Sequence, residues 1–303
     1  MITKVALVMA LAVLASISAV GSTARVSSPF PSGWIVVPIT PRGGIENAEL
    51  FRIRTDGTGL HRLTHTLMEE SDPLFAPNGK RVVFTRSGRG IFTIGLDGSG
   101  LRQLTVYAHD QHPVYSPDGT RIAFLRDNRL YVMQSDGRRQ RLLRRAPRLS
   151  FRPSWSPDGR RIVVGAGDNT DAVLYTLDAR TGRILKRTLL MEGDLADGLN
   201  EALLAPDGRT VVFDAYRPPP PNCQGLQCEV YALYRRALAR GISSTGVVCN
   251  DCFADAWSAD GRVLLITRPA QLELRVVRDG RTKVVNLHAY QRWCCGVATL
   301  QPR

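Results

Sequence analysis

A short turn sequence recurs along the chain at a spacing of about 40 residues, and this repeat constrains the fold more than any other feature. Two clear copies, Ser116-Pro117-Asp118-Gly119 and Ser156-Pro157-Asp158-Gly159, are 40 residues apart. A fixed period of this length is typical of folds that are built by repeating one supersecondary unit. The five copies occupy residues 76–79, 116–119, 156–159, 205–208 and 258–261.

The residues around each turn predict four short strands. Proline at the second position presets φ for a type I turn, and glycine closes the turn. A β-branched run follows, such as "RIAFL" from Arg121, and indicates a buried strand. A third strand usually ends at a second Asp-Gly turn, such as Asp136-Gly137, which is a strong hairpin signal, and a fourth short strand closes the unit. Four antiparallel strands in each unit predict an all-β fold, a β-propeller with four-stranded blades.

Counting these units predicts six blades, one of which is split between the two ends of the chain. "PSGWIVVPIT" from Pro31 matches a turn and a second strand, and "ELFRIRTDG" from Glu49 matches a third strand. The inner strand of this blade must come from elsewhere, and residues 297–302 resemble the segment that precedes every other turn. We therefore expect a single six-bladed domain over residues 25–303, with the ring closed by the C-terminal strand so that no sheet edge stays open. An N-terminal strand from "RVSSP" is the alternative closure.

The repeat resembles the TolB-type, WD40-like propeller repeat of exported bacterial proteins. The pattern P-x-[WYF]-S-P-D-G-x-[RK]-[IV] stands at Pro113 and again at Pro153, and related units cover roughly residues 31–303. The resemblance implies a propeller that docks a protein or peptide on the face bearing the channel mouth. It specifies no reaction, because the same repeat occurs in binding proteins, peptidases and lyases.

The N-terminal residues are typical of an export signal. Lys4 precedes an uncharged stretch from Val5 to Val20, and Ser22-Thr23-Ala24 supplies the small residues that a signal peptidase requires. We expect residues 1–24 to be a signal peptide that is cleaved after Ala24, which predicts a periplasmic or secreted protein. The alternative is an uncleaved membrane anchor, because about 20 apolar residues can span a bilayer.

The formal net charge of +13 restricts the class of partner only weakly. All but four of the 40 basic residues are arginines, and they are scattered over turns and strand ends instead of forming a stripe. A basic surface attracts polyanions. For an exported chain, an anionic lipid or wall polymer suits this charge better than a specific nucleic acid.

The loops that join the outer strand of one blade to the inner strand of the next all lie on one face of a propeller, together with the loops between second and third strands. We call these blade-joining segments the linking loops and this side the link face; the opposite side, with the Pro-Asp-Gly and Asp-Gly turns, is the turn face. Loops on a rigid scaffold carry function. The register places Asp72, His112, Arg152 and Glu201 just before their inner strands, with Ala254 in the sixth blade and Val297 in the split one. These residues predict a charged channel mouth that grips a partner, and an ordinary hydrated mouth of mixed charge is the alternative.

The segment His109-Asp110-Gln111-His112 raises the question of a metal site. Two histidines and a carboxylate are metal-ligand types, and propeller lyases that this family resembles use histidine and metal. Zinc, however, needs at least three protein ligands in a set geometry. A surface loop with two ordinary histidines is the simpler interpretation. We therefore expect no cofactor, and keep a metal-assisted lyase or hydrolase at the channel mouth as the alternative function.

The six cysteines all lie in the last third of the chain and on predicted link-face loops. Cysteines in even number in an exported chain indicate disulfides. A Cys-x-x-Cys metal site and a redox-active pair are the alternatives. Phe253 and Trp293 stand in the same loops and are candidate aromatic anchors for a partner. The cysteines are Cys223, Cys228, Cys249, Cys252, Cys294 and Cys295.

The sequence thus predicts a monomeric, exported propeller that binds a protein or peptide partner of the cell envelope without catalysis. The predicted partner-binding residues are Asp72, His109, Asp110, His112, Arg152, Glu201, Phe253 and Trp293.

We predict that the purified, oxidised protein contains disulfides, most simply Cys223–Cys228 and Cys249–Cys252. Adjacent cysteines form a strained bond, so Cys294 and Cys295 are expected to pair with the other loops instead. Peptide mapping by mass spectrometry without reduction checks this. Six free thiols, or thiols that only a chelator releases, would contradict the prediction.

Overall fold

The computed structural model describes the chain from residue 30 to residue 302 with gaps. The described residues are 30, 32–40, 47–144, 149, 152–167, 171–192, 199–217, 230–238, 245–250, 253–258, 260–268, 271–276, 280–285 and 298–302. They form strands and turns, and no helix among them has the length and hydropathy of a membrane span. The expected signal peptide of residues 1–24 lies outside the described residues.

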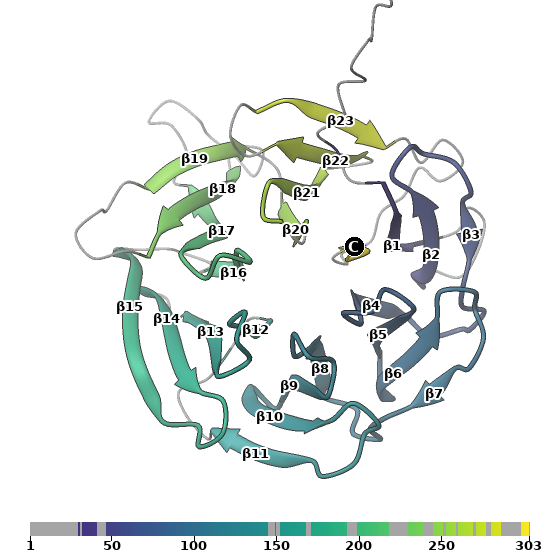
Figure 1. Ribbon diagram of the computed structural model, residues 1–303, viewed down its shortest axis with the longest axis horizontal. Coiled ribbons are helices and arrows are strands. Elements are labelled where there is room, and N and C mark those ends of the chain that lie inside the picture. The colour runs from purple at the N-terminus through teal and green to yellow at the C-terminus, as the bar shows by residue number, and fades with distance from the viewer. Residues whose placement is uncertain are drawn as a thin grey trace, which may run out of the picture.

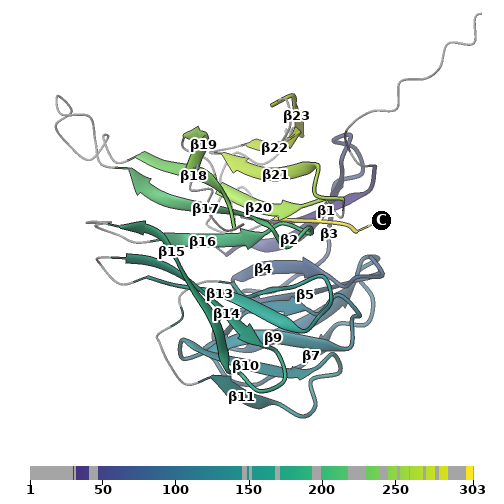
Figure 2. The same cartoon turned by 60° about the vertical axis from the view of Figure 1, so that its left-hand side comes forward.

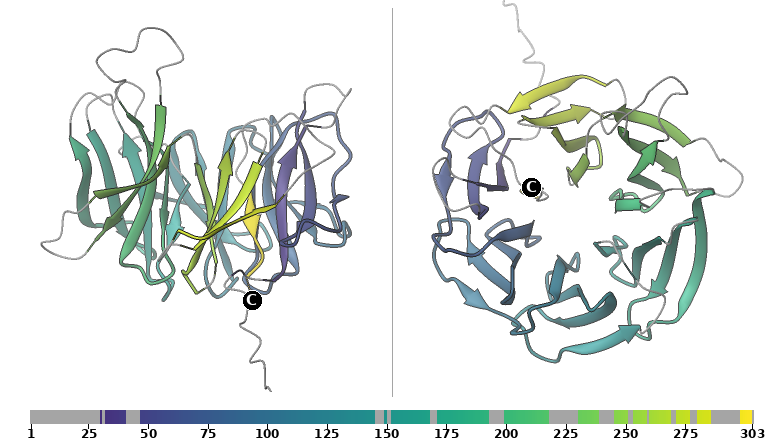
Figure 3. Two further views of the ribbon diagram at one scale, coloured as in Figure 1. Left: turned by 90° about the horizontal axis from the view of Figure 1, so that it is seen from above. Right: turned by 180° about the vertical axis from the view of Figure 1, so that it is seen from behind.

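Six four-stranded antiparallel sheets form a ring around a central axis (Figure 1), which confirms the predicted six-bladed propeller. Each blade runs from an inner strand at the channel to an outer strand at the periphery (Figures 2 and 3). From the channel outwards, blade 1 contains β24 (Thr299–Leu300), β1 (Trp34–Ile39), β2 (Glu49–Arg54) and β3 (His61–Arg62); blade 2 contains β4 (Glu70–Phe75), β5 (Arg81–Arg86), β6 (Gly90–Gly95) and β7 (Arg102–Gln103); and blade 3 contains β8 (Asp110–Tyr115), β9 (Arg121–Arg126), β10 (Arg129–Gln134) and β11 (Arg141–Arg144).

The second half of the ring follows the same order. Blade 4 contains β12 (Ser154–Trp155), β13 (Arg161–Gly167), β14 (Asp171–Asp178) and β15 (Ile184–Glu192); blade 5 contains β16 (Leu199–Leu204), β17 (Thr210–Arg217), β18 (Val230–Ala237) and β19 (Thr245–Asn250); and blade 6 contains β20 (Phe253–Trp257), β21 (Val263–Arg268), β22 (Gln271–Val276) and β23 (Thr282–Val285).

The core consists of apolar clusters between neighbouring blades. Each blade is covered on both faces, so a second strand such as β5 carries the consecutive apolar residues Val82, Val83 and Phe84, all fully buried. Val82 and Phe84 pack toward blade 1 and Val83 toward blade 3. Strands buried on both faces give continuous apolar runs instead of alternation. One such cluster joins each pair of neighbouring blades, including blades 6 and 1.

The repeated turns are held by their own side chains and by the preceding turn. In blade 3 the carboxylate of Asp118 accepts bonds from the Ser116 hydroxyl at 2.5 Å and the Thr120 amide at 3.1 Å. Gly119 has φ of +71°, and a Cβ there would lie 3.5 Å from Pro77 of the previous turn. The same glycine-on-proline contact recurs at Gly159, Gly208 and Gly261. Successive turns therefore stack around the channel on the turn face.

The C-terminal strand closes the ring, as predicted. In β24, Leu300 pairs with Ile35, and Thr299 pairs with Val36. Gln301 completes a split turn: its amide donates to the Trp34 carbonyl at 2.8 Å, and its side-chain oxygen accepts from the Trp34 amide at 3.1 Å.

The same two bonds exist within blade 3. The Ser116 amide donates to the Arg121 carbonyl at 2.9 Å, and the Ser116 hydroxyl accepts from the Arg121 amide at 3.0 Å. Gln301 therefore takes the place of the turn serine, with the two halves of the turn supplied by opposite ends of the chain. Its side-chain amide also donates to the Gly79 carbonyl of blade 2 at 2.9 Å.

We predict that deleting residues 296–303 abolishes cooperative unfolding, because β1 then loses its inner neighbour and exposes an open edge. Urea unfolding followed in parallel by circular dichroism and tryptophan fluorescence measures this. A truncated protein with the midpoint and slope of the full-length chain would contradict the closure.

Gln301→Ala and Ser116→Ala form a matched pair of milder variants. Each removes the same side-chain acceptor, and each should lower the free energy of unfolding by about 1 kcal/mol. Only Gln301→Ala should also accelerate amide exchange in β1.

Candidate functional site

Most of the predicted mouth residues lie inside the inner strands, although the sequence predicted them just before the strands. Arg152 instead precedes β12. Asp72 belongs to β4 and His112 to β8. In both strands the pairing register shifts at this point, and both residues have positive φ, 50° for Asp72 and 55° for His112. Each precedes a proline, Pro73 or Pro113, which has no N–H for the ladder and is tolerated at such a bulge. The bulge turns Asp72 and His112 toward each other.

Asp72 and His112 form a pair between blades 2 and 3, with 3.2 Å between Nδ1 of the imidazole and Oδ1 of the carboxylate. The carboxylate also accepts from the hydroxyls of Ser71 at 3.2 Å and Thr85 at 3.3 Å. Burial alone would raise the pKa of Asp72, but His112, Arg152 and Ser71 together hold this pKa well below its usual range. Asp72 is therefore a carboxylate at neutral pH.

Arg152 connects this pair to the far side of the channel. The residue is only 3% exposed, although it was predicted at the mouth. It lies close enough to Asp72 of blade 2 to lower the pKa of that carboxyl, and its Nη1 donates to the Asp255 carbonyl of blade 6 at 3.5 Å. One side chain of blade 4 thus acts on the charge of Asp72 in blade 2 and donates a hydrogen bond to blade 6.

In blade 6 the residue at the mouth is Asp255, and the prediction of Ala254 is wrong. β20 has a register shift between Ala254 and Ala256, which places Asp255 at the bulge. Its carboxylate accepts from the Thr267 hydroxyl, as that of Asp72 accepts from Thr85. Counting from the turn missed this residue because the bulge in β20 lies one position later than in β4.

Blade 5 also contributes acidic residues. Glu201 lies in β16 directly opposite Asp214 of β17, and Asp214 is 1% exposed. The side chain of Glu201 lies outside the described residues. The acidic character of the inner strands therefore extends to blade 5, with Asp214 as a residue that the sequence analysis did not select.

The three ionisable residues of the segment 109–112 point to three different partners. His109 pairs with Asp127 at 2.8 Å on the surface, and Asp110 pairs with Arg126 in the interior. His112 faces Asp72. No group of three or more metal-ligand side chains forms among the described residues.

Buried ion pairs support two of the linking loops and were missed by the sequence analysis. Asp110 and Arg126 are cross-strand neighbours joined by two bonds of 2.5 and 2.8 Å. Glu70 and Arg86 occupy the same register in blade 2, with 2.9 Å from Nε to Oε1. Asp110, joined by this bond, raises the pKa of Arg126, and burial raises the pKa of Glu70. The signal for both pairs was an acid seven residues before the turn proline and an arginine nine residues after it.

The remaining predicted residues concentrate in the last third of the chain. Trp293 and five of the six cysteines are outside the described residues. Cys249 lies within β19 and Phe253 begins β20, so both belong to strands where loops were expected, and the side chain of neither is described. These five cysteines are Cys223, Cys228, Cys252, Cys294 and Cys295.

Comparison with known proteins agrees with this architecture. The family model described as the TolB beta propeller domain matches residues 28–199. The chain belongs to this family. TolB from Acinetobacter baumannii has a similar structure with a TM-score of 0.67 and 16% sequence identity, covering 89% of this chain and 67% of that one.

Two further structures share the fold. A putative TolB from Agrobacterium tumefaciens matches with a TM-score of 0.55 and 17% identity over 84% of this chain and 88% of that one. Hydrazine synthase from Kuenenia stuttgartiensis matches with a TM-score of 0.56 and 13% identity over 75% of this chain and 70% of that one. A search among curated proteins finds no match. At these identities the structural likeness establishes the fold of this TolB-family propeller and not its activity.

We predict that Asp72→Asn lowers the free energy of unfolding at pH 7 by about 2–3 kcal/mol, the scale expected for a carboxylate with a strongly depressed pKa. Because the folded pKa is depressed, this stabilisation is complete above the ordinary aspartate pKa of about 4 and is lost as the pH falls below it. The difference between wild type and variant should therefore shrink in acid. Urea unfolding at a series of pH values measures it.

Asp127→Asn is the control for this series, because Asp127 pairs with His109 at the surface and should contribute under about 1 kcal/mol at any pH. A difference for Asp72→Asn that stays constant from neutral to acid pH would show that the carboxylate charge is not the stabilising group.

Proposed function

We propose that this TolB-family propeller is an exported, monomeric protein of the cell envelope that binds a protein or peptide partner on its link face without catalysis. The observation that carries the proposal is the gathering of Asp72, His112, Arg152 and Asp255 from four different blades at the link end of the channel. Charged groups that are fixed by several blades form a rigid centre for recognition. Rigid sites bind with a smaller loss of conformational entropy than mobile ones.

The partner's contact is expected to extend from this centre to the linking loops around it. Family membership supports protein docking, and the export signal expected in residues 1–24 supports a periplasmic or secreted location. Phe253 and Trp293 remain the proposed aromatic anchors, with Glu201 and His109 beside the mouth. The side chains of the segment 109–112 diverge, so within the described residues no observation favours a metal-assisted lyase or hydrolase.

The test is site-specific photo-cross-linking in the native envelope. A benzophenone amino acid is introduced at His109 on the link face, where the side chain is 76% exposed, or at Arg138 on the turn face, where it is 79% exposed. We predict a discrete cross-linked protein adduct only from position 109. An adduct formed only from position 138 would place recognition on the opposite face, and adducts from neither position would argue against a protein partner.

Once the partner is captured, Trp293→Ala should weaken its binding about tenfold or more, as expected for an anchor worth 1–2 kcal/mol. The matched control is Asp118→Ala in a turn, which should lower stability and leave the dissociation constant unchanged. Isothermal titration calorimetry on both variants distinguishes loss of binding from loss of fold.

A further inference from the structure

The most exposed large apolar side chains in the described part of the chain lie in two neighbouring linking loops. Leu67, 76% exposed, stands between blades 1 and 2, and Val106 and Tyr107, 77% and 58% exposed, stand between blades 2 and 3. Exposing apolar groups to water is unfavourable, and several such groups on one region of a surface mark an interaction site. Leu101, the next in exposure, follows an Asp-Gly turn on the turn face.

The hairpin turn of residues 87–89 and the adjoining Gly90 approach both of these loops. The Ser87 amide donates to the Glu69 carbonyl at 2.9 Å, which fixes the turn to the first loop. On the other side, the carbonyl of Arg89 accepts from the Gln103 side chain at 2.8 Å. Gly90 lies so close to the second loop that a Cβ would come within 2.8 Å of the Tyr107 carbonyl. We call the surface formed by Leu67, Arg89, Val106 and Tyr107 the rim patch.

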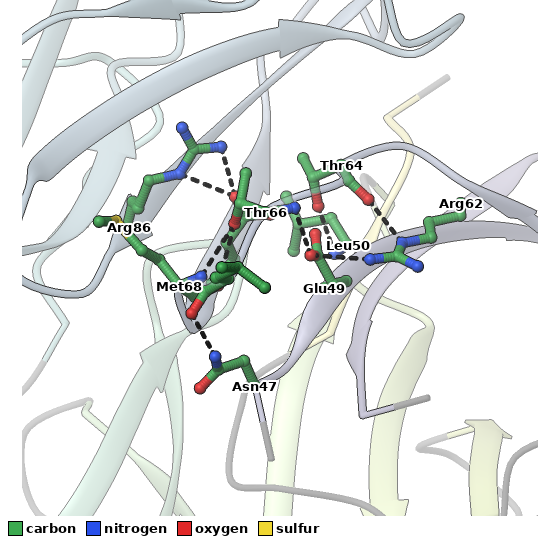
Figure 4. Close-up of polar contacts among 10 residues, drawn as sticks. Asn47, Glu49, Leu50, Arg62, Thr64, Thr66, Met68 and Arg86 are labelled. Carbon is green, nitrogen blue, oxygen red and sulfur yellow. Dashed lines mark hydrogen bonds and ion pairs between the residues drawn. The ribbon is translucent and has the colours of Figure 1, made fainter. Parts of the chain in front are cut away.

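Buried polar contacts fix the first loop of the rim patch (Figure 4). Glu49 is 1% exposed and accepts from Arg62 at 2.9 Å and from the Thr66 amide at 2.5 Å. The Thr66 hydroxyl donates to the Met68 carbonyl at 3.1 Å, and the Asn47 side chain donates to the Leu67 carbonyl. These hydrogen bonds therefore fix the backbone on either side of the exposed Leu67 side chain.

An ion pair supports the second loop in the same way. The guanidinium of Arg126 lies 4.1 Å from the centre of the Tyr107 ring, and the buried Asp110 holds that guanidinium with two bonds. A ring stacked on an anchored cation keeps one orientation. Tyr107 is thus exposed on one side and fixed on the other, as preorganised contact residues at interfaces are.

The charges around the rim patch indicate which class of partner fits. On its three loops and on the neighbouring turn of residues 127–129, the positive charges of Arg89 and Arg129 are balanced by the negative charges of Glu69 and Asp127. His109 pairs with Asp127 at 2.8 Å. An anionic membrane or polymer needs a net positive surface, which this balance does not provide. The outer strands β3 and β7 have two residues each, too short for an added strand.

We propose that the rim patch is a second docking site on the link face, which binds a partner-protein segment through two or three apolar side chains packed on Tyr107, Val106 and Leu67. This rests on the proposed function, because it assumes that the link face binds protein. It adds a recognition site at the periphery of blades 1–3, separate from the charged channel mouth.

The probe for the test is a random peptide library displayed on phage and selected on the wild-type protein. Fluorescence anisotropy of the selected peptides is then measured against Tyr107→Ser, Val106→Ser and the control Leu101→Ser, an exposed apolar residue on the turn face. We expect peptides rich in apolar residues, whose affinity falls about tenfold in either rim variant, about 1.4 kcal/mol, and stays unchanged in the control. Tyr107→Phe keeps the ring and should keep the affinity, which distinguishes lost contact from lost fold.

Other outcomes would overturn the proposal. Peptides that bind both rim variants as well as wild type, but lose affinity in His112→Gln, would locate recognition at the channel mouth alone and leave the proposed function intact. Peptides that are insensitive to both sets of variants would count against both proposals. Sedimentation that depends on concentration and is abolished by Tyr107→Ser would make the occupant a second copy of this chain. Binding to phosphatidylglycerol vesicles that is lost in the same variant would make it a membrane.

Discussion

The structure depends on burying both faces of every blade. A four-stranded sheet with two apolar faces is stable only between two neighbours, and burial of apolar area is the main favourable contribution to folding. If the ring of six blades stayed open, the outer faces of the first and last blades would be exposed to water, together with the unpaired edge of β1. The chain avoids this by placing Ala298 and Leu300 in the same apolar cluster as Ile35 of blade 1 and Leu265 of blade 6. The interface between blades 6 and 1 is then equivalent to the other five.

The same constraint explains why the charged residues collect where they do. The residues at the bulges of the inner strands make polar contacts instead of joining the apolar clusters between blades: Asp72 pairs with His112 of the next blade, and Asp255 accepts from Thr267. The left-handed backbone conformation of Asp72 and of His112 costs about 1–3 kcal/mol at each residue, although Asp and His adopt it more readily than most residue types. The compensation is electrostatic: His112 and Arg152 stabilise the charge of Asp72, and Arg152 also donates to the backbone carbonyl of Asp255. Stability and the proposed recognition site thus use the same side chains.

The fold was readable from the sequence because its information is local. Pro117, Asp118 and Gly119 each have a defined role in one turn, and the strand after the turn is a short apolar run. The start of the inner strand was not readable, because Pro73 and Pro113 interrupt the ladder and give the preceding residues the appearance of a loop. Nor was β19 of blade 5 predicted, since residues 245–250 lack the turn signals of the other units.

The candidate site was only partly predictable, because its contacts join distant parts of the chain. Asp72 and His112 were selected from their distance to the turn, and they lie within the inner strands β4 and β8. Their contact with each other depends on the bulge, which no local pattern encodes. The approach of Arg152 to Asp255 spans 103 residues and three blades, and follows only from the closed ring.

Buried ion pairs at the ends of the strands hold two of the linking loops in position. Asp110–Arg126 and Glu70–Arg86 lie at the ends of strands, where the ladder stops and the loop begins. Breaking such a buried pair leaves an uncompensated charge, which is energetically costly. The pair therefore keeps the adjoining loop in place. The exposed Tyr107 of the second loop lies on the guanidinium of Arg126 and is fixed in the same way. In the proposed function, recognition on the link face therefore depends on side chains whose orientation the blade determines.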